Sequence, residues 1–292
     1  MKIFLSVLSK EELMTIIQAI ILGIVQGLTE LLPVSSSAHL YLIPWAFGWL
    51  NSESFQIAFD GFDVALHAGT LLAIAIFFFK DWIGLIKGGW NQVVKKEKSF
   101  EGKMFWYIVL ATIPGGIIGF ILDKYAEDYL KQPLIIAIAL IIMGIILYFV
   151  DKKAPNKTEY KDMSLKQTFF VGLSQSLAFI PGVSRSGVTM TTARLLGVKR
   201  ESAAKYSFLL STPIVLAATL YKFIDFLDPV YRTTFINSGM LLPFILGILA
   251  SFIVGIIVIK FLLNYLKKSD FKIFTIYRII IGIAVIVFFF IK

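Results

Sequence analysis

"QAIILGIVQGLTELLPVSSS", residues 18–37, decides the fold, because it is an apolar helical stretch that a proline and three serines interrupt. A second stretch, "QTFFVGLSQSLAFIPGVSRS" at residues 167–186, matches the first at a constant offset of 149 positions, from 18 to 167. The matched positions are Gln18 with Gln167, Gly23 with Gly172, Gln26 with Gln175, Ser35 with Ser184 and Ser37 with Ser186. The chain therefore contains an internal repeat, and its two copies are broken at nearly the same place, since only the proline is shifted, by one position.

The composition is that of a membrane protein. Of 292 residues 58% are hydrophobic and 16% are charged, and the mean hydropathy is +0.82, whereas about a quarter of the residues in a soluble domain are charged. Six further apolar stretches are long enough, or nearly so, to cross a hydrocarbon core of ~30 Å. They are residues 64–79, 104–122, 134–150, 206–224, 240–263 and 273–291. We therefore predict an all-α polytopic protein, with residues 1–292 forming one integral membrane domain.

The loops between these stretches alternate in charge. Residues 80–103, 151–166 and 264–272 are rich in lysine, whereas residues 51–62, 123–133 and 225–239 are not. Since basic loops stay in the cytoplasm, the first three segments are predicted there and the last three outside. The net charge of +9 is then explained by loops that face anionic lipid, and no nucleic-acid partner is predicted. The absence of cysteine excludes disulfides and thiolate chemistry.

The repeat predicts an inverted topology. Each broken stretch is followed by three spans, and because three is odd, the second copy must enter the membrane from the opposite side. We expect two re-entrant helix-loop-helix segments beside the six spans, a first repeat at 13–150, a second at 167–292, and both termini outside. Inverted repeats commonly meet at the middle of the bilayer, where irregular backbone needs protein or water around it.

Glu30 is the first candidate for chemistry. It lies four residues after Gln26, so the two share one helical face, and a carboxylate at membrane depth costs at least ~2–3 kcal/mol on insertion scales. A metal ligand or an acid/base group would explain it, with Gln26 as a neutral oxygen ligand for Mg²⁺ or Ca²⁺. The alternative is a glutamate at the membrane interface where a helix ends.

The serines after Pro33 form the second candidate. Ser35, Ser36 and Ser37 can cap a new helix, whose free N–H groups would then bind an anion. His39 lies three and four residues after Ser36 and Ser35, within reach of either hydroxyl, and a serine beside a histidine is a possible activated nucleophile. The alternative is that the serines only cap and that His39 is a satisfied polar residue.

The second copy brings an arginine. In "PGVSRSGVT", residues 181–189, hydroxyls again precede a predicted helix, and Arg185 lies between Ser184 and Ser186. A guanidinium in an apolar repeat needs an anion, and its geometry suits phosphate oxygens. The alternative is a structural ion pair with Glu30. We therefore expect a phosphate-bearing ligand and a metal bridge where the two copies meet.

Two other polar residues carry less weight. His67 follows Asp63 by one turn and is expected at the interface, although a supporting role is open. Arg278 is expected to extend toward the cytoplasmic interface from the start of the last span. No Walker loop, zinc spacing or nucleotide fingerprint is present.

The broken stretches resemble a known family. "GIVQGLTELLPVSSSAH" (23–39) and "PGVSRSGVT" (181–189), with "YSFLLSTP" and "IYR" further along, are similar to motifs of the undecaprenyl-diphosphatase family of bacitracin-resistance membrane phosphatases. The resemblance covers essentially the whole chain. It implies hydrolysis of a polyprenyl diphosphate to the monophosphate and inorganic phosphate, which recycles the lipid carrier for cell-envelope glycan synthesis. It also implies a divalent metal and an active site that opens to the outer side of the cell membrane.

The resemblance also implies roles for individual residues. Carried over by position, the catalytic residues are Glu30, Ser36, His39 and Arg185; the phosphate-binding residues are Ser35, Ser37, Ser184, Ser186 and Thr189; and the metal ligands are Glu30 and Gln26. The first acidic position of the motif, often glutamate in relatives, is Gln26 here, which leaves Glu30 as the principal anionic ligand. Ser36, Ser35 and water remain alternative nucleophiles, and a homodimer remains open. A transporter that flips polyprenyl phosphate without hydrolysis is the competing function.

Overall fold

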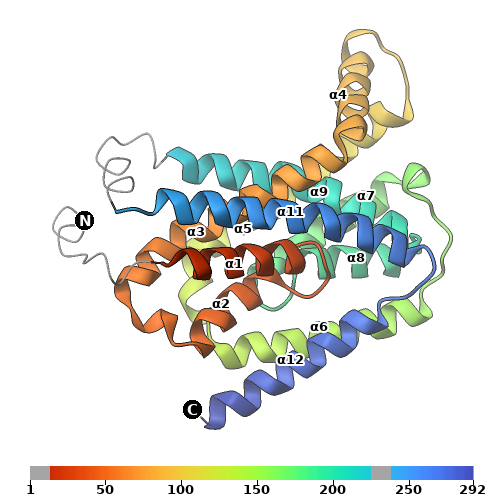
Figure 1. The fold of residues 1–292 in the computed structure, drawn as a ribbon. Coiled ribbons are helices and arrows are strands. Elements are labelled where there is room, and N and C mark those ends of the chain that lie inside the picture. Colours follow the sequence, from red (N-terminus) through yellow and green to blue (C-terminus); the bar gives the residue numbers. More distant parts are fainter. Residues whose placement is uncertain (1–13, 225–237, 292) are drawn as a thin grey trace.

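The computed structural model describes residues 14–224 and 238–291, and these form helices joined by short connections (Figure 1). The described residues contain no strand, only one isolated bridge between Thr158 and Val198. The long helices are α1 (Ile16–Thr29), α2 (Ser36–Ala46), α3 (Glu53–Phe77), α4 (Phe79–Val94), α5 (Phe100–Leu130), α6 (Pro133–Lys153), α7 (Leu165–Ser174), α8 (Arg185–Leu195), α9 (Arg200–Phe223), α11 (Leu241–Leu266) and α12 (Lys272–Ile291). Short 3₁₀ helices lie at Trp49–Asn51, Tyr160–Asp162 and Gln175–Phe179. The predicted all-α class is confirmed.

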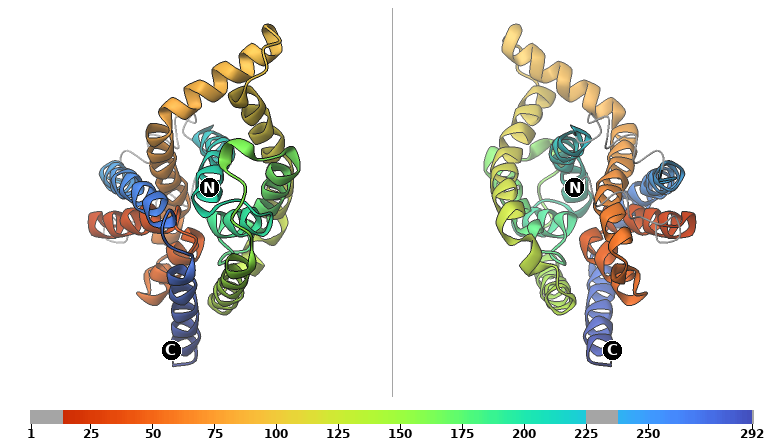
Figure 2. Two further views of the ribbon diagram at one scale, coloured as in Figure 1. Left: turned by 90° about the vertical axis from the view of Figure 1, so that its right-hand side faces the viewer. Right: turned by 90° about the vertical axis from the view of Figure 1, so that its left-hand side faces the viewer.

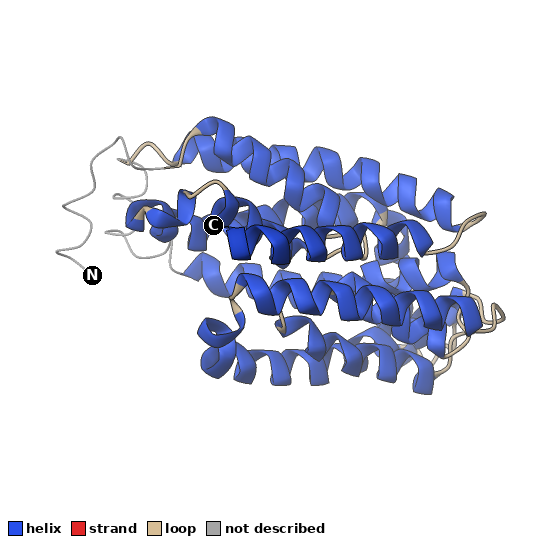
Figure 3. Cartoon of the chain, turned by 90° about the horizontal axis from the view of Figure 1, so that it is seen from below, coloured by secondary structure: helices blue, strands red, loops and turns tan. Residues whose placement is uncertain are grey.

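Five described helices are long and apolar enough to cross a membrane. They are Phe100–Gly119 within α5, α6, Arg200–Tyr221 within α9, α11 and α12. A sixth is obtained only if α3 and α4 are counted as one broken span, since a bend of 77° separates Gly61–Phe77 from Phe79–Val94. The predicted first span, 64–79, thus lies in α3 up to this bend. Most of the long helices run along one shared direction (Figure 3).

The three lysine-rich segments, 80–103, 151–166 and 264–272, meet at one end of the bundle. Lys205 at the start of α9 pairs with Asp81 of α4 at 2.6 Å. Asp151 at the end of α6 pairs with Arg200 at 2.9 Å and accepts the backbone N–H of Phe271 at 3.3 Å. These contacts define what we call the lysine-rich end.

The first described helix begins, and the last one ends, at the opposite end of the bundle (Figure 1). Met14 and Phe55 belong to one buried cluster with Met240 at the start of α11. Trp45 at the end of α2 packs edge-on against Phe288 near the end of α12, with ring centroids 5.2 Å apart. The terminal residues 1–13 and 292, and nearly all of the predicted outer loop 225–239, lie outside the described residues.

The two copies of the repeat are built alike. Thr15 and Gln18 form a capping box at the start of α1, and Ser164 and Gln167 form the same box at the start of α7. Contacts between copies are exchanged as well, because α1 packs along α11 whereas α7 packs along α5. Figure 2 views the molecule from its two ends, along the direction that most helices share.

Glycines bring α1 and α7 into backbone contact with their neighbours. A Cβ at Gly23 would lie 2.4 Å from the carbonyl oxygen of Gly247 on α11. At the matched Gly172, a Cβ would lie 2.1 Å from the carbonyl oxygen of Ala111 on α5. Small residues at such crossings allow helices to approach closely inside a membrane.

Candidate active site

The two helix breaks lie against each other. The first break separates α1 from α2, and the second separates the 3₁₀ helix at Gln175–Phe179 from α8. Ser35 Oγ accepts the backbone N–H of Gly182 at 3.2 Å, and Ser186 Oγ donates to the carbonyl oxygen of Leu32 at 2.9 Å. The two breaks are therefore bonded to each other by Ser35, which lies just before α2, and by Ser186, which lies just inside α8.

The serines that precede α2 and α8 share a rare backbone conformation. Ser35 has φ 78° and Ser184 has φ 74°, in the region where residues other than glycine are uncommon. Ser35 Oγ accepts from the N–H of Ala38 at 3.4 Å, and Ser184 Oγ accepts from the N–H of Gly187 at 3.1 Å. Such strain is tolerated where the surroundings fix the backbone, and it occurs often at functional sites.

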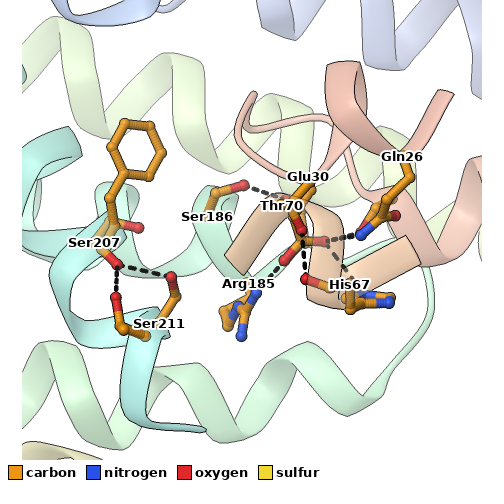
Figure 4. Close-up of polar contacts among 12 residues, drawn as sticks. Gln26, Glu30, His67, Thr70, Arg185, Ser186, Ser207 and Ser211 are labelled. Carbon is orange, nitrogen blue, oxygen red and sulfur yellow. Dashed lines mark hydrogen bonds and ion pairs between the residues drawn. The ribbon is translucent and has the colours of Figure 1, made fainter. Parts of the chain in front are cut away.

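Glu30 lies at the centre of the site, 8% exposed (Figure 4). Arg185, the first residue of α8, donates from Nη2 to Glu30 Oε1. Ser36, the first residue of α2, donates from Oγ to Glu30 Oε2 at 2.5 Å. The same oxygen accepts from Gln26 Nε2 at 3.4 Å and lies 3.4 Å from His67 Nε2. One buried carboxylate thus binds both helix starts.

A pocket of about 300 Å³ opens beside this carboxylate. It is lined by residues of both breaks and by the facing sides of α3 and α9: Glu30, Ser36, Ser37, Asp63, Val64, His67, Gln175, Ala178, Phe179, Ser184, Arg185, Ile214, Val215, Ala218 and Thr219. The α3 residues lie near the middle of that helix, and the α9 residues lie in its second half, which is the half farther from the lysine-rich end. The pocket therefore extends away from the lysine-rich end, from a polar floor toward apolar walls.

The chain was compared with known proteins. The sequence model of the family described as "Bacitracin resistance protein BacA" matches residues 19–284. An undecaprenyl-diphosphatase of Pelotomaculum thermopropionicum is 49% identical over 274 residues, which cover 94% of this chain and 97% of the relative. An undecaprenyl-diphosphatase of Caldicellulosiruptor bescii is 45% identical over 280 residues, which cover 96% and 99%. The chain belongs to the BacA family.

The predicted phosphate-binding residues of this BacA-family chain divide into two groups. Ser37 and Ser184 line the pocket together with Arg185. Thr189 does not line it, because its hydroxyl donates to the carbonyl oxygen of Arg185 at 2.7 Å and contacts Ser207 Oγ at 2.7 Å. Like Ser35 and Ser186, Thr189 holds the backbone of the break. Phosphate binding by any of these residues stays a prediction.

His39 lies differently from what its spacing predicts. Its Nδ1 contacts the backbone oxygen of Ser35 at 2.7 Å, and its Nε2 contacts the hydroxyl of Tyr277 at 2.7 Å. The predicted contact of the imidazole with a serine hydroxyl is therefore not formed, since Ser36 donates to Glu30 instead. Tyr277 is on α12, and local spacing carries no information about it. The catalytic role of His39 stays a prediction.

The expectation that His67 lies at the interface was wrong. Its Nδ1 is 2.9 Å from the backbone oxygen of Asp63 and 3.5 Å from Asp63 Oδ1, while its Nε2 faces Glu30. The sequence did contain a signal for this position, because His67 follows Asp63 by one helical turn and both lie in an apolar stretch. The histidine of this family member that approaches the site carboxylate is thus on α3.

The expectation for Arg278 was also wrong. Its side chain does not extend to the interface but is fully buried. Nη1 donates to the carbonyl oxygen of Pro33 at 2.9 Å, Nη2 donates to that of Gly182 at 2.6 Å, and Nε donates to that of Leu140 at 3.1 Å. Breaks leave carbonyl oxygens without helical partners, and one guanidinium satisfies those of both copies. Its position two turns inside α12, rather than at the helix end, was the available signal.

Ser207 and Ser211 of α9 also belong to the site, although they were not among the residues predicted from the sequence. They line a second cavity of about 10 Å³ together with Glu30, Arg185 and Ser186, beside the site in Figure 4. Such a volume is about that of one water molecule. The two serines are four residues apart in "YSFLLSTP" and so lie on one face of a membrane helix.

Glu30 and Gln26 are the residues that could hold a divalent cation in this site. Within the described ranges, no group of three or more His, Cys, Asp or Glu could hold a metal. However, Gln26 is fully buried, and its Oε1 has no hydrogen-bond partner among the described residues. Mg²⁺ is usually held by one or two carboxylates together with substrate phosphates. Glu30 and Gln26 fit that arrangement.

Proposed function

We propose that this protein hydrolyses undecaprenyl diphosphate to the monophosphate and inorganic phosphate in the cell membrane, which recycles the lipid carrier for cell-envelope glycan synthesis and confers bacitracin resistance. The names of its relatives support this activity, and they favour hydrolysis over a flippase that leaves the diphosphate intact. The observation that carries the proposal is the convergence of Arg185 and Ser36, each the first residue of a helix, on the buried carboxylate of Glu30.

The proposed topology has six spans and two re-entrant segments in an inverted repeat, 13–150 and 167–292. The matched capping boxes and the exchanged contacts of α1 and α7 support it. Since lysine-rich segments stay inside, the lysine-rich end is cytoplasmic in this proposal. Both termini are then outside, and the pocket opens to the outer side of the membrane.

In the proposed complex, the diphosphate lies at the polar floor of the pocket. Arg185 and the N-termini of α2 and α8 bind its oxygens, since helix starts and guanidinium groups both suit phosphate. The isoprenoid chain leaves between α3 and α9, where Phe179, Ile214 and Val215 line the pocket. This arrangement stabilises the charge that develops during phosphoryl transfer, usually the dominant contribution.

The proposed nucleophile is Ser36, and its hydrogen bond to Glu30 supports this role. Its Oγ attacks the terminal phosphorus, its proton passes to Glu30, and the bond from that phosphorus to the bridging oxygen breaks. The lipid leaves as the monophosphate, and water then cleaves the phosphoserine to release inorganic phosphate and restore the serine. The predicted alternative is direct attack by a water molecule that His39 activates.

A divalent cation, Mg²⁺ or Ca²⁺, is part of the proposal. Glu30 and the amide oxygen of Gln26 would hold it together with phosphate oxygens. When bound, it would neutralise part of the negative charge of the diphosphate.

Phosphate release from the purified protein tests this function. The protein in detergent, given undecaprenyl diphosphate and Mg²⁺, is expected to release phosphate. Arg185→Ala is expected to lose at least ~100-fold in kcat/KM, the usual scale for a group that stabilises transition-state charge. A chelator should abolish the release, and re-added metal should restore it. Binding of the lipid without any phosphate release by the folded protein would refute hydrolysis and favour the flippase.

A further inference from the structure

Helix α4 leaves the bundle at the lysine-rich end. By length alone, the 25 residues of α3 reach about 37 Å at 1.5 Å per residue, so that a core of ~30 Å can be crossed without α4. The chain then bends by 77°, so that the 16 residues of α4, about 24 Å in length, advance only ~5 Å along the direction of α3. The helix projects sideways from the bundle (Figures 1 and 2).

One face of α4 is covered and the other is not. Leu85 is buried, and Gly88 and Gly89 lie against the start of α5, where a Cβ at Gly89 would meet the ring of Phe105 at 2.3 Å. The uncovered face carries exposed apolar side chains at the spacing of one helical stripe. This apolar stripe consists of Phe79 (61% exposed), Ile83 (38%), Ile86 (55%), Trp90 (66%), Val93 (51%) and Val94 (56%).

Lysines border this stripe. Lys80 and Lys87 follow Phe79 and Ile86 directly, and both are exposed. Residues 95–98, exposed in the turn beyond α4, add three more lysines and one glutamate. Residues 80–98 thus hold five lysines against Asp81 and Glu97, a net charge of +3, and Asp81 is itself paired with Lys205.

We propose that α4 is an interfacial helix that binds anionic phospholipid headgroups on the membrane face at the lysine-rich end. An apolar stripe with aromatic residues, bordered by lysines, is the pattern of helices that lie in the interface plane. The lysines bind the headgroups while the stripe enters the acyl boundary, and anionic lipid is preferred over neutral lipid because of the net positive charge.

The size of the stripe argues against a second copy of the chain as its occupant. A helix about 24 Å long and ~10 Å wide offers roughly 240 Å² on one face. A stable interface needs about 800 Å² from each partner. In a symmetric pairing of two stripes, the bordering lysines of both copies would also approach one another.

Depth measurements test where the stripe lies. The chain has no cysteine, so one can be introduced into the full-length protein at Trp90→Cys or, in the turn, at Lys98→Cys. Each variant is labelled with the fluorophore NBD and placed, one protein per nanodisc, in phosphatidylcholine with phosphatidylglycerol. The label at position 90 is expected to emit at shorter wavelength, to be quenched by spin-labelled acyl chains and to be protected from iodide, whereas the label at position 98 is quenched by iodide.

Equal iodide quenching at positions 90 and 98 would overturn the proposal. So would protection of position 90 that arises only with two proteins in a disc, because a second copy would then cover the stripe.

Lipid selection tests the role of the lysines. The double variant Lys80→Gln/Lys87→Gln is compared with Lys153→Gln/Lys268→Gln, which removes the same charge from exposed positions at the same end but off α4. Native mass spectrometry gives the ratio of retained phosphatidylglycerol to phosphatidylcholine. The first variant is expected to lower this ratio by up to about fivefold for each lysine, and the second, whose lysines do not border the stripe, is expected to lower it clearly less.

Equal effects of the two variants, or no effect of the first, would refute headgroup binding by α4. If the first variant unfolds, Lys95→Gln/Lys96→Gln in the turn gives the same comparison.

Discussion

At the scale of single residues, the site is organised by the hydrogen bonds that the carboxylate of Glu30 accepts. Arg185 and Ser36 donate to different oxygens of this carboxylate, although they belong to different copies of the repeat. In the sequence alignment of the copies, Ser36 and Arg185 occupy the same position. The two copies have therefore diverged at this position, and each supplies a different donor to the same carboxylate.

Ser36→Ala is expected to remove a phosphoenzyme. In rapid-quench experiments with substrate labelled in the terminal phosphate, the unchanged protein should form a labelled serine, and the variant should not. Its kcat should fall by at least ~100-fold, because the proposed route passes through a covalent bond between Ser36 Oγ and the terminal phosphorus. Turnover that persists in Ser36→Ala but is lost in His39→Asn would contradict this route and support activated water.

Arg278→Met is expected to destabilise the protein strongly. Methionine keeps an unbranched apolar side chain but removes every donor. Buried carbonyl oxygens in both breaks are then left without partners, and each lowers the free energy of unfolding by about 1–3 kcal/mol. Thermal unfolding in detergent measures the loss. Arg278→Lys should restore only part of it, since one ammonium cannot reach both breaks. Full stability of Arg278→Met would show that the breaks hold without the guanidinium.

At the scale of elements, glycines decide how closely the helices pack. Gly23→Ala is expected to lower the free energy of unfolding by about 1–3 kcal/mol, because the added methyl group meets the backbone of α11. Gly116→Ala on α5 is the matched control, since nothing lies within 4 Å of the place that its methyl group would take, and it should stabilise the helix by ~0.5–1 kcal/mol. Equal shifts in unfolding temperature would contradict the role assigned to the α1–α11 contact.

The elements also show what could be predicted from the sequence. Both breaks were predicted, because proline, glycine and capping serines act locally. The repeat also predicted that Arg185 and Glu30 lie close together, but their direct ion pair was the alternative to an arginine that binds phosphate. The bend after α3 was not predicted, since the apolar residues Phe77, Phe78 and Phe79 read as one continuous span. The contacts of Tyr277 and Arg278 with residues far away in the sequence depend on tertiary packing, which periodicity does not encode.

At the scale of the whole molecule, one buried acid ties the lysine-rich end together. Asp151 is 4% exposed and accepts from Arg194 at 2.7 Å, from Arg200 at 2.9 Å and from the N–H of Phe271. It therefore connects the end of α6 with α8, α9 and the start of α12. The end of the bundle opposite to the opening of the pocket is thus closed by buried hydrogen bonds and ion pairs.

Asp151→Asn is expected to lower the free energy of unfolding by about 3–5 kcal/mol, because it leaves the buried Arg194 without its counter-charge. Glu159→Gln is the matched control at the same end, since the pair of Glu159 with Lys199 is exposed and much weaker. Thermal unfolding of both variants in detergent gives the comparison. A similar small shift for both would mean that Asp151 does not hold this end.

The position of Arg278 has a consequence for synthesis of the chain. The carbonyl oxygen of Pro33 and the guanidinium that binds it are 245 residues apart, and at 5–20 residues per second the ribosome needs roughly 10–50 s to bridge that interval. Until α12 has been made, the carbonyl oxygen of Pro33 in the first break lacks the guanidinium that donates to it. A nascent protein that stalls or is truncated before α12 therefore lacks the guanidinium that binds the carbonyl oxygens of both breaks.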